Sequence, residues 1–229
     1  MKFYVKTITA ALGAAILFSG CAFSVPEPPA RANTLIEDLS LLKPSPLNEN
    51  ALYYIDKETD FSTYNNIIIN PVKVITNTKD EDVNEQLIKD ISTYFNAILS
   101  KDIKSVYPNN GKNLKSLQLS ISIVNIEATY DDLKIYQYLP YGLAFTALKR
   151  GTGIEDRKAR VSLAIKLYDA KTLKTLALLV DKEAGKDIDY DEKVTLDSVK
   201  PILDEWSRLS KVRLTELKNG KYTKQLKEK

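Results

Sequence analysis

The chain of 229 residues is 44% hydrophobic and 28% charged, with only 8 Gly and 9 Pro, a composition that fits one compact domain and excludes collagen-like or low-complexity chains. Its 33 Lys and Arg nearly balance 30 Asp and Glu, so the charge does not predict the concentrated basic face that nucleic acid requires. The absence of His and the single Cys exclude Ser-His and Cys-His nucleophile pairs, an internal disulfide and a thiolate zinc cluster.

Residues 1–20 are predicted to be an export signal. Two Lys precede the apolar stretch 8–18, which is about half as long as the roughly 20 residues that a membrane span requires. The small residues Ser19 and Gly20 then lead into Cys21, a pattern that resembles the lipobox of bacterial lipoproteins. The resemblance implies cleavage before Cys21 and attachment of lipid to its sulfur.

The covalent lipid at Cys21 is predicted to be a diacylglycerol together with an N-acyl chain such as palmitate, and no other cofactor is expected. Two or three acyl chains make release from a membrane negligible, since each buried methylene contributes about 0.8 kcal/mol. Ala22 stands where lipoproteins retained in the inner membrane carry Asp, which favours the periplasmic face of the outer membrane. Residues 21–42, with Pro26 and two further Pro, are predicted to form an extended tether.

A single periplasmic α+β domain is predicted over residues 43–220, with a mixed, largely antiparallel sheet and helices packed mainly on one face. The apolar run Leu52–Ile55 predicts an edge strand. The β-branched segment Asn65–Thr76 predicts a second strand, which Pro71 restricts to an edge or a bulge. Residues 80–99 begin with acids and carry an apolar stripe at helical spacing, so they are predicted to form a helix.

The second half of the domain is predicted to contain three further strands and a long helix. Alternating apolar residues predict a strand at 117–126 and a hairpin whose strands, 161–167 and 173–180, flank the turn Asp169–Thr172. The last helix is expected to be capped by Asp197 or Ser198, with Pro201 in its first turn. Its buried apolar stripe is predicted to run from Val199 to Leu209. Residues 221–229 are expected to be a solvated basic tail.

Several short motifs follow the lipobox along the mature chain: Leu41–Pro44, Tyr53–Asp56, Asp60–Tyr64, Ile69–Val72, Leu139–Ala144, the turn at Asp169 and Asp204–Trp206. Their order is similar to that of a proteobacterial lipoprotein family known as domain of unknown function 3313. The likeness covers nearly the whole mature chain, although Leu173 stands where a Gly is commoner in the turn. The resemblance implies an envelope lipoprotein and no catalytic residues.

The segment Tyr130–Arg150 is the best sequence candidate for contact with a partner protein. Tyr136, Tyr138, Tyr141 and Phe145 gather beside an apolar run, and Tyr is enriched at interface cores. The same pattern also fits a helix that covers the sheet, with its Tyr hydroxyls at the rim. Both interpretations remain open at this point.

Other candidate sites have simpler explanations. Asp187, Asp189, Asp191 and Glu192 alternate as in some calcium loops but lack the Gly and the bidentate Glu of that pattern, so a solvated acidic loop is expected. The pair Asp131-Asp132 is not accompanied by any sign of a sugar cleft, and Gly151–Gly153 is too short for a phosphate-binding loop. No metal site and no catalytic residue are predicted.

The first functional hypothesis is a non-enzymatic structural or accessory subunit of an envelope assembly, for example a secretion or export complex such as a type IV system. It combines a permanent membrane anchor with a protein partner and with the absence of a catalytic set of residues. The alternative is a tethered periplasmic binding module for lipid, peptidoglycan or a small ligand, which predicts a concave apolar pocket and stabilisation by ligand.

Overall fold

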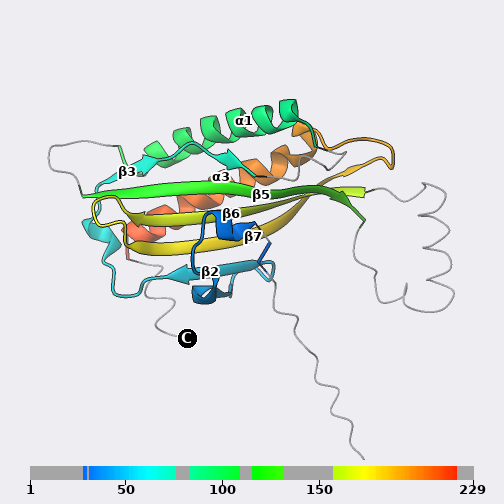
Figure 1. The fold of residues 1–229 in the computed structure, drawn as a ribbon. Helices are drawn as coiled ribbons and strands as arrows, with labels where there is room; N and C mark the ends of the chain where they lie inside the picture. The colour runs from blue at the N-terminus through cyan, green and yellow to red at the C-terminus, as the bar shows by residue number, and fades with distance from the viewer. Residues whose placement is uncertain (1–27, 30, 76–82, 109–114, 131–156, 221–229) are drawn as a thin grey trace, which may run out of the picture.

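The computed structural model describes residues 28–29, 31–75, 83–108, 115–130 and 157–220. Within these ranges the chain forms one seven-stranded mixed sheet and two long helices, which lie on the same face of the sheet (Figure 1). The predicted α+β class with helices on one face is therefore confirmed. None of the helices in these ranges is long and apolar enough to cross a membrane.

The seven strands form one sheet in the order β1-β2-β7-β6-β5-β3, and β4 also pairs with β5. The β3 and β4 strands run parallel to β5, whereas the other pairs are antiparallel, which confirms the predicted mixed and largely antiparallel sheet. The strands are β1 Lys43–Pro44, β2 Ala51–Ile55, β3 Asn66–Ile69, β4 Lys73–Val74, β5 Ser116–Thr129, β6 Arg157–Asp169 and β7 Thr175–Ile188.

The long central strands follow from the alternation of apolar and polar residues. In β5, Leu117, Leu119 and Ile121 are buried on the helical face, and the intervening Gln118 and Ser120 are only half-buried. This pattern matches the period of two that a strand imposes on its side chains. The predicted strand and hairpin are confirmed. The β5 and β6 strands extend beyond the alternation at both ends, whereas β7 begins at Thr175, after the predicted start at 173, and continues to Ile188.

Pro71 divides the predicted strand 65–76 into β3 and β4. Because Pro has no backbone N–H, it cannot donate to a ladder and lies between two short strands that pair with the same side of β5. The predicted edge position of Pro71 is confirmed. The run Leu52–Ile55, predicted as an edge strand, lies one place further in, because β1 pairs along its outer side.

The α1 helix spans Glu85–Lys104, and its five buried residues recur every four positions, which places them on one face. The predicted range 80–99 was wrong at both ends. The Asn84 side chain accepts a hydrogen bond from the backbone N–H of Leu87 at 2.8 Å, so Asn84 is the N-cap and the first turn begins after it. The buried residues are Leu87, Ile91, Phe95, Leu99 and Ile103.

The α3 helix spans Leu196–Lys218 and is capped by Thr195, so the predicted caps Asp197 and Ser198 were wrong. The Thr195 hydroxyl accepts from the backbone N–H of Ser198 at 3.2 Å, and the Ser198 hydroxyl accepts from the backbone N–H of Thr195 at 3.0 Å. This reciprocal capping box satisfies two donors at the helix start. As a consequence, Pro201 lies in the second turn of α3 and not in the first.

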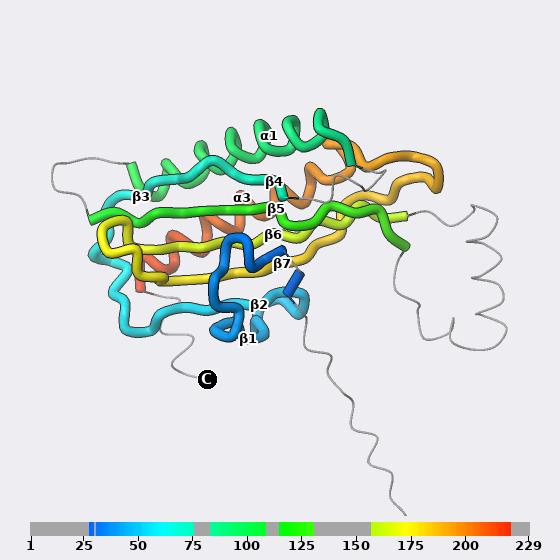
Figure 2. The backbone as a smooth tube through the Cα atoms, in the orientation of Figure 1, coloured from blue at the N-terminus to red at the C-terminus, as the bar shows by residue number. Residues whose placement is uncertain are grey.

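The second face of the sheet is partly covered by the start of the folded chain, which lies in front of the sheet in Figure 2. This part of the chain contains two short 3-10 turns, Ala32–Thr34 and Leu39–Leu41. Ala32, in the first turn, and Ile36, between the two turns, are 0% and 1% exposed. The tether predicted for residues 21–42 therefore ends earlier, because these two side chains pack into a second apolar cluster. Their partners in the sheet are Leu52, Val124, Ala164, Leu178 and Val180.

Candidate functional site

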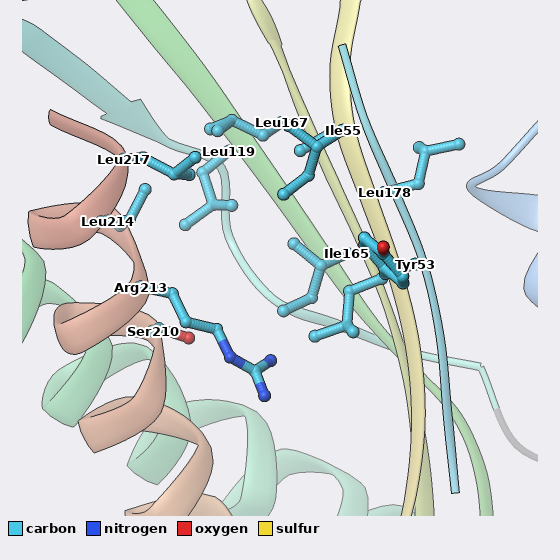
Figure 3. A pocket seen from close by; sticks show the side chains of 12 residues that line it. Tyr53, Ile55, Leu119, Ile165, Leu167, Leu178, Ser210, Arg213, Leu214 and Leu217 are labelled. Carbon is cyan, nitrogen blue, oxygen red and sulfur yellow. The ribbon is translucent and has the colours of Figure 1, made fainter. Parts of the chain in front are cut away.

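An apolar opening lies between the second half of α3 and the helical face of the sheet (Figure 3). We call it the α3 crevice, and its volume is about 100 Å³. Four of the seven strands and one helix contribute to its walls, so it forms only when α3 packs on the sheet. The lining residues are Tyr53 and Ile55 of β2, Leu119 of β5, Ile165 and Leu167 of β6, Ala177, Leu178 and Leu179 of β7, and Ser210, Arg213, Leu214 and Leu217 of α3.

The crevice exists because two positions between α3 and the sheet carry small side chains where larger apolar side chains would fill the space. The buried stripe of α3 runs through Leu203 and Trp206 and resumes at Leu214 and Leu217, at the spacing of one helix face. Ser210 occupies the stripe position between Trp206 and Leu214. A hydroxymethyl group cannot fill the space that a Leu would fill there, and Ala177 on β7 is also a lining residue. The space therefore remains open.

The apolar walls of the α3 crevice are not fully covered by the protein. Ile55, Ile165 and Leu179 are each half-buried, although they point towards the helical face where most of the core lies. Aliphatic side chains beside a void lose the dispersion contacts that a filled interior provides. The domain would therefore gain stability from any apolar group that enters the crevice.

Arg213 is the charged residue in the lining of the α3 crevice, and Figure 3 shows its side chain extending from α3 past Ser210. The same residue also lines a neighbouring depression that we call the polar hollow. Among the described residues, no group forms a hydrogen bond or salt bridge with Arg213. The polar hollow is lined by Leu47, Asn48, Glu49, Asn50, Glu183, Glu205, Leu209, Val212, Arg213 and Glu216.

A buried carboxylate lies beside the crevice on β7. Asp181 is 1% exposed and follows the lining residue Leu179 by two positions, so both face α3. Its carboxylate accepts hydrogen bonds from the Trp206 indole at 3.1 Å and from the Asn48 amide at 3.0 Å. Burial raises the pKa of Asp181 to about 6, assisted by the charge of Glu183 and opposed by the Trp206 hydrogen bond and by the positive charge of Arg213.

A second buried carboxylate, that of Asp169, stabilises the hairpin turn and does not form a binding site. The Tyr64 hydroxyl donates to Asp169 at 2.8 Å, and the backbone N–H groups of Lys171 and Thr172 donate to the other carboxylate oxygen. The hydrogen bond from the Thr172 backbone is the main cause that lowers the pKa of Asp169 to about 2. Both oxygens of this carboxylate are thus engaged, one within the turn and the other by Tyr64.

None of the sites predicted from the sequence coincides with the α3 crevice. Cys21 and the candidate contact residues lie outside the described residues, as do the Asp131-Asp132 pair and the Gly151–Gly153 turn. The acidic positions 187, 189, 191 and 192 are exposed, and the described residues contain no group of three or more acidic, His or Cys side chains that could hold a metal ion. The contact residues in question are Tyr136, Tyr138, Tyr141 and Phe145.

The α3 crevice was not predicted from the sequence. The apolar stripe of the last helix was followed only as far as Leu209, so the continuation to Leu214 and Leu217 was missed. The available signal was the interruption of this stripe by Ser210. Only the fold brings that interruption next to Ala177, which is 33 positions earlier in the chain.

Comparison with known proteins gives a family and a group of relatives. A family model described as "Protein of unknown function (DUF3313)" matches residues 31–210. The uncharacterized lipoprotein YdcL of Escherichia coli strain K12 is 24% identical over 201 residues, which is 86% of this chain and 90% of YdcL.

Two solved structures show weaker likeness. A single-substitution variant of PelC from Paraburkholderia phytofirmans, solved as a dodecamer, has a TM-score of 0.35 and 8% identity, covering 73% of this chain and 98% of PelC. Lipoprotein GNA1162 of Neisseria meningitidis has a TM-score of 0.23 and 9% identity, covering 63% of this chain and 97% of its own. At these TM-scores the two structures assign neither an assembly nor a ligand.

Proposed function

The chain belongs to the DUF3313 family, and from this premise we propose that it is a membrane-anchored envelope lipoprotein whose folded domain, without catalytic activity, binds apolar groups in the α3 crevice. The proposal joins an anchor at the N-terminus to a binding site on the helical face. The single observation that carries the binding function is the open, aliphatic crevice between α3 and the sheet.

Two observations support the anchor. The relative that matches 86% of this chain is a lipoprotein, and the sequence has an apolar stretch followed, after Ser19 and Gly20, by its only Cys. We propose that lipid is attached at Cys21, as diacylglycerol and an N-acyl chain, and that Ala22 directs the protein to the periplasmic face of the outer membrane. Mass spectrometry of the mature polypeptide would test this, because an unmodified thiol at Cys21 would rule the anchor out.

The dimensions of the α3 crevice limit what it can hold. Its volume of about 100 Å³ is smaller than the roughly 150 Å³ of an engineered cavity that binds benzene. The crevice therefore accommodates a short aliphatic group, such as one end of a longer molecule, and leaves the rest of that molecule outside. Its aliphatic walls favour hydrocarbon over sugar or peptide backbone, whose polar groups would be buried without partners.

A cavity-filling variant tests the site. In the lipidated full chain in nanodiscs, hexanol is expected to raise the melting temperature of the wild type and to change the fluorescence of Trp206, the only Trp of the sequence. Ser210→Leu restores the apolar stripe, so it is expected to melt higher without ligand and to lose the response to hexanol. The matched control Lys211→Leu changes an exposed position on the same helix and should respond as the wild type does.

Two results would reject the binding proposal. One is a wild-type protein that hexanol neither stabilises nor perturbs. The other is a Ser210→Leu protein that is folded, as judged by its circular dichroism, and still responds to hexanol as the wild type does. Because the variant adds apolar volume to an existing void, misfolding is not the expected outcome, and a raised melting temperature would show directly that the void was filled.

A structural role in an envelope assembly, including a secretion or export complex, is the second candidate function. It is favoured by the aromatic and apolar composition of the segment 136–145. Cross-linking in intact cells, followed by solubilisation, would test this role. Recovery of the unpartnered monomer under every growth condition would count decisively against it.

A further inference from the structure

The charge at the mouth of the α3 crevice indicates the kind of ligand that the crevice accepts. Arg213 lies one turn beyond Ser210 on α3, and both residues line the crevice. In Figure 3 the guanidinium of Arg213 stands on the same side of the opening as the Ser210 hydroxyl. A ligand whose aliphatic end enters the crevice would therefore place its next group beside a positive charge.

The guanidinium of Arg213 is not occupied by neighbouring acids in the described part of the chain. Glu205 forms its salt bridge with Arg208 at 2.6 Å. Glu183 accepts from the Asn48 amide at 2.9 Å, and Asp181 accepts from the same amide and from an indole. Asp181 and Glu205 interact electrostatically with Arg213, but neither forms an ion pair with it.

Glu216 and Glu49 complete the acidic lining of the polar hollow, into which Arg213 also faces. Neither forms a salt bridge with Arg213 among the described residues. Four Glu around one Arg disfavour an anion of high charge, because each added negative charge on the ligand is repelled by the rim. Among anions, one with a single negative charge meets less repulsion than a dianion such as phosphate and can still pair with Arg213.

We propose that the α3 crevice binds aliphatic monocarboxylates, with the hydrocarbon chain between α3 and the sheet and the carboxylate on Arg213. The inference rests on the proposed function and adds the head group to it. A planar guanidinium matches a carboxylate with two parallel N–H···O bonds, which a neutral head group cannot reproduce. The Ser210 hydroxyl, in the same lining, is available as a further donor.

A series of ligands with one chain length and different head groups tests the inference. Octanoate, octanol and octylammonium are titrated at about pH 7.5 into the lipidated full chain in nanodiscs of zwitterionic lipid, with Trp206 fluorescence as the readout. Octanoate is expected to bind roughly ten times more tightly than octanol, because one charge-assisted contact contributes about that factor to the affinity. Octylammonium is expected to bind more weakly than octanol.

The variant Arg213→Met keeps an apolar stem and removes the charge. It is expected to lose the preference for octanoate over octanol, measured as the ratio of the two affinities. Arg213→Lys should retain part of that preference, since a point charge remains without the planar fork. Lys211→Met, which removes an exposed charge from the same helix, serves as the matched control and should keep the wild-type order of affinities.

The outcomes separate the two proposals. Equal affinities for octanoate and octanol, tighter binding of octylammonium, or a carboxylate preference that survives in Arg213→Met would each overturn the head-group inference while the crevice remains a binding site. Failure of all three ligands to bind the wild type would overturn the proposed function itself. Carboxylate preference in the wild type and its loss in Arg213→Met together support the inference.

Discussion

The indole of Trp206 donates a hydrogen bond to the carboxylate of Asp181 across 3.1 Å, inside the domain, where α3 crosses β7. Both residues are almost completely buried, at 3% and 1% exposure. The ring of Phe95 lies 6.4 Å from the Trp206 ring in a tilted arrangement, so the same indole also contacts α1. One side chain thus links both helices to the sheet one turn away from the α3 crevice.

The buried acid predicts a specific dependence of stability on pH. Because the pKa of Asp181 rises from 3.8 to about 6 on folding, its ionisation is less favourable in the folded state. Its contribution is complete below about pH 4 and is lost as the pH rises through about 6. The Asp181→Asn variant cannot ionise, so its free energy of unfolding relative to the wild type should increase by up to about 3 kcal/mol over this window.

Urea denaturation of wild type and Asp181→Asn at a series of pH values would measure this difference. The exposed Asp189→Asn serves as the control and should track the wild type. The interpretation depends on the change with pH and not on the offset, since Asn cannot accept from both Trp206 and Asn48 as the carboxylate does. A difference that does not vary between about pH 4 and 7 would contradict the prediction.

The Tyr64 hydroxyl stabilises the hairpin turn through its hydrogen bond to Asp169. Tyr64→Phe should therefore lower the free energy of unfolding near neutral pH. The expected loss is about 2 kcal/mol, the typical contribution of a hydrogen bond to a charged group. The pKa of Asp169 is lowered to about 2, so its stabilising contribution is present above about pH 4 and is lost as the pH falls towards 2. The deficit of Tyr64→Phe should therefore shrink in acid. Tyr190→Phe, at an exposed Tyr, is the control, and equal stability of Tyr64→Phe and wild type would refute this account.

Leu173 adopts a left-handed backbone conformation with φ of 59° in the β6–β7 turn. A side chain with a Cβ is disfavoured there by about 1 kcal/mol or more, and the Leu173 side chain is 65% exposed, so little burial offsets this effect. Leu173→Gly should therefore raise the melting temperature by a few degrees. Leu173→Ala keeps the Cβ and should not be stabilised, and thermal unfolding of the two variants side by side distinguishes the backbone effect from simple loss of the side chain.

Gly185 of β7 packs against the first turns of α3, close to Ser198 and Ile202. A Cβ at this position would stand 2.2 Å from the backbone oxygen of Ser198, so the helix and the strand would have to separate. Gly185→Ala should lower the free energy of unfolding by about 2 kcal/mol, a typical effect of overpacking. The neighbouring Lys186→Ala, at an exposed position, should have little effect in the same denaturation experiment, and a Gly185→Ala protein of wild-type stability would show that the two elements have room to spare.

The periodic elements of the fold were predictable because their signals are local. Alternation of apolar residues identifies β5, β6 and β7, and the spacing of three and four residues identifies both helices. The helix starts were misplaced because several polar residues near each start can act as caps. Only the formed hydrogen bonds select Asn84 and Thr195 from among them.

The parts that could not be predicted depend on residues distant in the sequence. Ala32 and Ile36 stand in a segment whose composition suits an exposed tether, and their burial depends on contacts with strands elsewhere in the chain, including Ala164, Leu178 and Val180. The α3 crevice likewise depends on Ser210 facing residues from four strands. No local pattern contains that information.

The point at which the chain enters the domain determines how the domain is held. Ala32 and Ile36 fasten the entry to the sheet face opposite the helices. A load applied through the preceding residues would therefore be borne first by this small cluster and by the strands beneath it. The helices would not bear this load directly. The α3 crevice, which lies on the opposite face of the sheet, would remain accessible.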